Sequence, residues 1–182
     1  MLLAGSPDPA GPAAADEAAL RAAVRSCRLD DSRRVRLQAT LAAHWRDTGR
    51  FREAGLLFRL TLPSAERLAG QDAPVVGRIC NEWGLWAKYT GRFDLARRLY
   101  LRALEIFAVA SPASEAVAGI CHNLGGLAHV RGDAVEGQEW TRRSCEILAV
   151  RWGADHPVVA ADRVAWPRCW STVDRSSSPS RS

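Results

Sequence analysis

The chain has 182 residues, a net charge of +5 and 47% hydrophobic residues, which suits a folded domain or a short repeat array. No apolar run is long enough to span a membrane, and the apolar start is too short for a secretory signal. Five cysteines without a CxxC pair favour a reducing compartment. We therefore expect a cytoplasmic protein and exclude a small secreted, disulfide-linked one.

The N-terminal part differs in composition from the rest of the chain. Residues 1–15 are rich in Pro, Ala and Gly and predict a flexible leader. Residues 16–31 predict an extra helix and a connector, because small apolar residues recur there at helical spacing. We expect this helix to cover the exposed face of the repeat that follows.

An internal repeat organises the middle of the chain. Thr48-Gly49-Arg50-Phe51 returns as Thr90-Gly91-Arg92-Phe93, a step of 42 residues, and more loosely as Arg131-Gly132-Asp133-Ala134, a further 41. Ile79-Cys80 likewise returns as Ile120-Cys121. The register predicts three repeats, over 32–73, 74–114 and 115–155.

Each repeat predicts two helices. In the second repeat an apolar stripe of helical spacing ends before Gly91, a residue suited to a left-handed helix end. A second stripe follows and stops at Ser111-Pro112, since the residue before proline avoids the helical region. Ser114 predicts the N-cap of the next helix, which should run to about Val130. No stretch alternates with period two, so the predicted class is all-α.

These repeats resemble the tetratricopeptide repeat (TPR) family. Leu99-Tyr100-Leu101-Arg102-Ala103-Leu104-Glu105-Ile106 is similar to the second helix of that family, and Gly153-Ala154-Asp155-His156-Pro157-Val158-Val159-Ala160 resembles the start of a repeat in its kinesin-light-chain-like, long-repeat subclass of bacterial type. The resemblance implies a right-handed α-solenoid of antiparallel helical hairpins, with about three repeats and a partial fourth.

The repeat pattern fails near the C-terminus. A fourth repeat starts at His156, but Asp162 and Pro167 stand where the earlier repeats have Ile and Ala or Gly. We expect a partial repeat over 156–168 and a disordered tail over 169–182. The chain would then be a truncated or frame-altered piece of a longer array, able to self-associate through its incomplete C-terminal repeat.

The resemblance implies a binding groove, because the first helices of such repeats line a concave surface that holds a peptide or a partner segment. Amides bind a peptide backbone, and cations bind carboxylates or phosphates. The alternative is that these side chains are ordinary solvated helix faces. The groove positions transferred to this chain are Arg36, Arg78, Asn81, Lys88, His122, Asn123 and His129.

The sequence offers no catalytic or metal motif. It has no Gly-x-Ser-x-Gly elbow and no phosphate-binding Gly-rich loop with a Lys. His122 and His129 share a helix face, but no HxxxH or CxxC spacing supplies further zinc ligands. We expect neither catalytic residues nor a metal or other cofactor.

The predicted function is therefore non-catalytic protein–protein interaction. Long repeats of this subclass often accompany nucleotide-binding signalling modules, which implies a fragment of a larger bacterial regulatory protein. The alternative is a nucleic-acid-binding helical repeat using clustered arginines. That alternative is less favoured, since most of these arginines fall on second helices, where solvated charge is usual. The clusters are Arg33-Arg34-Val35-Arg36, Arg97-Arg98 with Arg102, and Arg142-Arg143.

Overall fold

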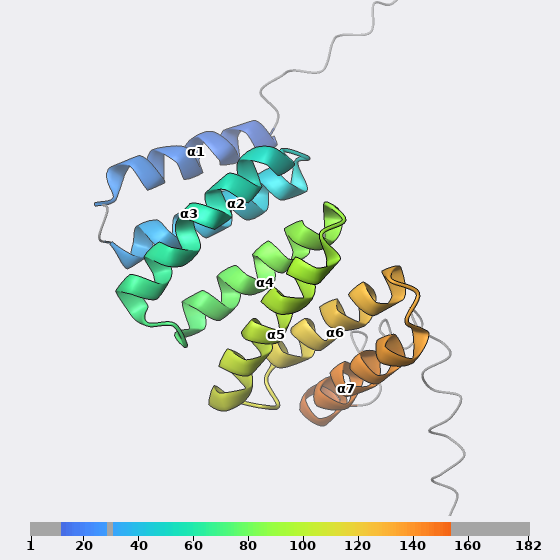
Figure 1. Ribbon diagram of the computed structural model, residues 1–182. Coiled ribbons are helices and arrows are strands. Elements are labelled where there is room, and N and C mark those ends of the chain that lie inside the picture. Colours follow the sequence, from blue (N-terminus) through green and yellow to red (C-terminus); the bar gives the residue numbers. More distant parts are fainter. Residues whose placement is uncertain (1–11, 29–30, 154–182) are drawn as a thin grey trace, which may run out of the picture. The chain divides into compact units, whose positions relative to one another are not determined.

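The computed structural model describes residues 12–28 and 31–153, and this part of the chain is all-α, as predicted (Figure 1). None of its helices is long and apolar enough to cross a membrane. Residues 1–11, the partial repeat 156–168 and the tail 169–182 lie outside the described residues. The helices are α1 (Pro12–Ser26), α2 (Ser32–Asp47), α3 (Phe51–Ala69), α4 (Pro74–Tyr89), α5 (Phe93–Ala110), α6 (Glu115–Val130) and α7 (Ala134–Trp152).

The chain divides within α4 into two compact units, residues 1–82 and 83–182. In the first unit, α2 packs against α3 as a hairpin and α1 packs against α2. In the second unit, α6 and α7 form a hairpin and α5 packs against α6. The two-helix repeat unit predicted from the sequence is therefore present.

Glycine closes each hairpin at the point the register predicts. Gly49, Gly91 and Gly132 have φ angles of 81°, 73° and 82°, a region that other residues rarely adopt. The predicted end of α5 and the start of α6 are also confirmed: α5 stops at Ala110, and the Ser114 side chain accepts a hydrogen bond from the Val117 amide.

Small residues allow the paired helices to approach closely. In the second unit, a Cβ at Gly84 would lie 2.6 Å from the ring of Tyr100, and one at Gly125 would lie 2.6 Å from Oγ1 of Thr141. Tyr100 and Thr141 are both buried. Bulk on one helix thus fills the space that its neighbour leaves empty.

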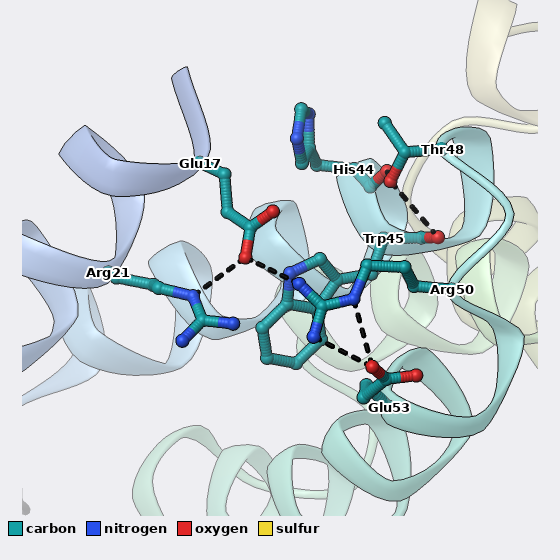
Figure 2. A network of polar contacts seen from close by, with 7 residues as sticks. All are labelled: Glu17, Arg21, His44, Trp45, Thr48, Arg50 and Glu53. Atoms are coloured by element: carbon teal, nitrogen blue, oxygen red, sulfur yellow. Dashed lines mark hydrogen bonds and ion pairs between the residues drawn. The ribbon is translucent and has the colours of Figure 1, made fainter. Parts of the chain in front are cut away.

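A charged network holds α1 on the first hairpin (Figure 2). One carboxylate oxygen of Glu17 accepts hydrogen bonds from Arg21 and Arg50, each at 2.7 Å. The two guanidinium groups also lie over the ring of Trp45, 5.2 and 5.0 Å from its centroid. Arg50 in turn pairs with Glu53 on α3. Through these contacts Glu17 joins α1 to both helices of the hairpin.

Acid is expected to loosen α1 through Glu17. The indole N–H of Trp45, and then Arg21 and Arg50, lower the pKa of Glu17 below its ordinary value of 4.5, against an opposing effect of burial. A lowered native pKa stabilises the fold at pH values above 4.5, and this stabilisation is lost as the pH falls through the native pKa. The protection factors of residues 16–26 against hydrogen exchange should therefore fall in acid more than those of the other helices.

The Glu17→Gln variant provides the test of this pH dependence. Its α1 should have low protection factors already at neutral pH, and these should change little further in acid. Glu105→Gln, which alters an exposed carboxylate on α5, is the matched control and should behave like the wild type. If α1 is equally protected in the wild type and in Glu17→Gln at both pH values, Glu17 is not the group that loosens α1 in acid.

Candidate functional site

The residues predicted to bind a partner lie on the first helix of each hairpin. Arg36 and Arg78 are exposed, and the other five are half-buried. The first unit carries Arg36 on α2 and Arg78 and Asn81 on α4; the second carries Lys88 on α4 and His122, Asn123 and His129 on α6.

One repeat position holds a basic side chain or a histidine in all three repeats, and we call it the cation position. It is Arg46 in the first repeat, Lys88 in the second and His129 in the third, at steps of 42 and 41 residues. Arg46 is absent from the predicted set, although the repeat register could have found it. The three side chains have different surroundings, which distinguishes the repeats chemically.

Arg46 is neutralised within the chain. It is only 9% exposed and donates hydrogen bonds to a carboxylate oxygen of Glu82 at 2.7 Å and to Asp47 at 2.9 Å. Burial opposes its charge, but the hydrogen bonds from Arg46 to Asp47 and Glu82 outweigh burial and raise the pKa of Arg46. Asn81 donates to the other Glu82 oxygen at 3.2 Å. In the first unit, Asn81 thus helps to hold an internal ion pair.

Lys88 has the same repeat position and no such counter-ion. No carboxylate of the described residues lies within ion-pair distance of this half-buried lysine, the only one in the sequence. Burial is the sole cause that lowers its pKa. The register explains the difference: the residue 41 positions after Glu82 is Asn123, so an amide replaces the carboxylate.

The Lys88 side chain lies against α6. A Cβ at Gly126 would be 3.6 Å from Nζ of Lys88, so the ammonium group is next to a helix face without a side chain. The half-buried His122 and Asn123 are on the same helix. Part of the ammonium hydration is removed here, and nothing anionic in the described residues compensates for it.

His129 is placed differently from Lys88. Its ring lies against Gly137 of α7, where an added Cβ would be 2.8 Å from two ring atoms. It therefore belongs to the contact between the two helices of the third hairpin. Together with His122 and Cys121 it forms no metal site, since the described residues contain no group of three or more metal-binding side chains.

Several of the clustered arginines already have partners. Arg97 pairs with Glu136 at 3.0 Å, and Arg142 pairs with Glu139 and Glu146. Arg143 lies over the ring of Trp140, 5.8 Å from its centroid. These contacts lower the positive charge that the second unit can offer to a phosphate backbone.

The comparisons with known proteins identify the fold. No family model and no curated protein matches the sequence. Among solved structures, BtubC (BKLC) from P. vanneervenii has a TM-score of 0.73 and 22% identity, over 94% of this chain and 79% of that chain. A Podosopora anserina protein described as a kinesin light chain with nearly identical TPR-like repeats has a TM-score of 0.72 and 18% identity, over 91% and 81%. The chain therefore has the fold of the kinesin-light-chain-like TPR proteins, an all-α solenoid of helical hairpins, as the sequence resemblance predicts.

Proposed function

We propose that this chain is a non-catalytic protein-interaction module whose first helices bind a segment of a partner protein, with a partner carboxylate at Lys88. The observation that carries the proposal is the cation position: Arg46 has Glu82 as its counter-ion, whereas Lys88 has only an amide residue, Asn123, at the equivalent place. An ammonium group that is half-buried without a counter-ion gains more from a carboxylate than a fully hydrated one.

The surroundings of Lys88 support a peptide as the ligand. Gly126 leaves backbone accessible beside Nζ, and an Asn side chain at 123 can both donate and accept hydrogen bonds. The TPR-like fold also supports this proposal, because repeat arrays bind partners along extended helical surfaces. The internal pairing of Arg97 and Arg142 makes nucleic acid the less suitable ligand. The role in a larger bacterial regulator stays a prediction from the sequence.

The test is an unbiased selection of displayed peptides on the wild-type protein, followed by affinity measurements on variants. We expect the selected peptides to share an Asp, a Glu or a free C-terminus. Lys88→Met should weaken them about tenfold or more, since a hydrogen bond to a charged group contributes about 1.5–3 kcal/mol. Lys88→Arg should retain most of the affinity.

Asn123→Glu is the sharper variant, because it gives Lys88 the counter-ion that Arg46 already has. We expect it to raise the pKa of Lys88 and to weaken peptide binding as much as Lys88→Met, while leaving the helix content unchanged. Arg98→Gln, at an exposed position on α5, is the control and should bind normally. The proposal would be refuted if the selected peptides bind Asn123→Glu and Lys88→Met with the same affinity as the wild type.

A further inference from the structure

The exposed face of α3 is unusually apolar for this chain. Leu60 is 69% exposed and Leu56 is 47% exposed, although both lie in the interior of α3. Pro63 is exposed one turn further along. These residues are spaced at i, i+4 and i+7, so they form one stripe along α3. The stripe faces away from the residues of α3 that are buried.

The other two repeats provide an internal control. At the position of Leu56 they have Arg98 and Glu139, and at the position of Leu60 they have Arg102 and Arg143. Pro63 corresponds to Glu105 and Glu146. A helix in this place in the repeat therefore folds with charged side chains on its exposed face. The fold does not require the apolar residues of α3, which points to a role outside folding.

Arginines flank the apolar stripe. Arg52, Arg59 and Arg67 are all exposed, and none of them forms an ion pair with a described residue. This contrasts with Arg97 and Arg142 of the second unit, which pair with glutamates. The α3 face is therefore both apolar and positively charged.

We propose that this α3 face, formed by Arg52, Leu56, Arg59, Leu60, Pro63 and Arg67, binds an acidic amphipathic helix of a partner protein. Apolar residues of that helix cover Leu56 and Leu60, and its carboxylates pair with the arginines. From Arg52 to Arg67 the face is about 22 Å long at 1.5 Å per residue, which matches a partner helix of about four turns. The α3 face shares no residue with the Lys88 site, and the proposal does not depend on the proposed function.

The probe is a synthetic helix of two heptads, about four turns long, with Leu at the two core positions and Glu at the flanking positions. Its glutamates repel each other and disfavour self-association. Fluorescence anisotropy should show saturable binding to the wild type that weakens with added salt. The same helix with Lys in place of Glu should not bind.

Variants locate the binding to α3. Leu56→Gln with Leu60→Gln should weaken the acidic helix at least tenfold, and Arg59→Gln should weaken it severalfold. Arg98→Gln removes the same charge from α5 and should have no effect. Circular dichroism and thermal unfolding of the Leu variants should match the wild type, because the changed side chains are exposed.

Three results would overturn the proposal. They are equal binding of the acidic helix to the Leu56→Gln, Leu60→Gln variant, equal binding of the lysine-containing helix, and a failure of the acidic helix to bind. Anionic phosphatidylserine vesicles or single-stranded RNA bound through Leu56 and Leu60, with no binding of the acidic helix, would assign the face to a membrane or to nucleic acid instead.

Discussion

Replacing Tyr100 by alanine is expected to lower the free energy of unfolding by about 3–5 kcal/mol, the usual cost of truncating a large buried aromatic residue. Tyr100 is fully buried, and its ring fills the space opposite Gly84. The cavity left by alanine would lie at the centre of the second repeat. Chemical denaturation followed by circular dichroism measures the loss.

Gly84→Ala tests the same contact from the other side. The added methyl group would lie 2.6 Å from the Tyr100 ring, and overpacking of this kind costs about 1–3 kcal/mol. Combining Gly84→Ala with Tyr100→Leu should recover part of that cost, because leucine removes the ring that meets the methyl group. Gly119→Ala is the control, since a Cβ at Gly119 meets nothing within 4 Å. Strict additivity of Gly84→Ala and Tyr100→Leu would show that the two residues do not interact.

Replacing Glu82 by leucine is the second change with a large expected effect. It leaves the buried guanidinium of Arg46 with Asp47 as its remaining carboxylate partner. Loss of one member of a fully buried pair costs about 3–5 kcal/mol; because the Glu82 side chain is 33% exposed, we expect about 2–3 kcal/mol. Denaturant unfolding at neutral pH measures this difference.

The double variant Arg46→Met, Glu82→Leu separates an ion-pair effect from a packing effect. It removes both charges and keeps apolar volume, so it should regain most of the lost stability. Breaking the exposed Arg142–Glu146 pair by Glu146→Gln is the control and should cost about 0.3–0.5 kcal/mol, as expected for a surface pair one helical turn apart. If the double variant is less stable than Glu82→Leu alone, the charge on Arg46 is not the source of the instability.

The sequence predicts the hairpins well because their signals are local. Gly91 at a helix end, Ser114 as an N-cap and the stop before Pro112 each depend on neighbouring residues alone. The recurrence of these signals at one step then identifies the repeat. Cys80 and Cys121 share a repeat position and are both fully buried, so that position is part of the core.

The surroundings of the charged residues are harder to predict because they depend on distant contacts. An arginine near the end of an amphipathic helix predicts a solvated side chain, yet Arg46 is buried against Glu82, 36 residues further on. The sequence places Lys88 in the candidate site, but the absence of a nearby carboxylate is visible only in the structure. The side chain of His129 likewise lies in the hairpin contact, a location that its position on the helix does not specify.

The single lysine of the sequence also makes the candidate site observable by spectroscopy. Reductive methylation with ¹³C-labelled formaldehyde would give one side-chain amine signal, which reports on Lys88 without site-directed labelling. Its chemical shift as a function of pH would follow the ionisation of this one ammonium group, whose pKa burial lowers. The same resonance would then report the binding of any anion at Lys88. The other 24 basic side chains counted in the net charge are all arginines, which this reaction does not label.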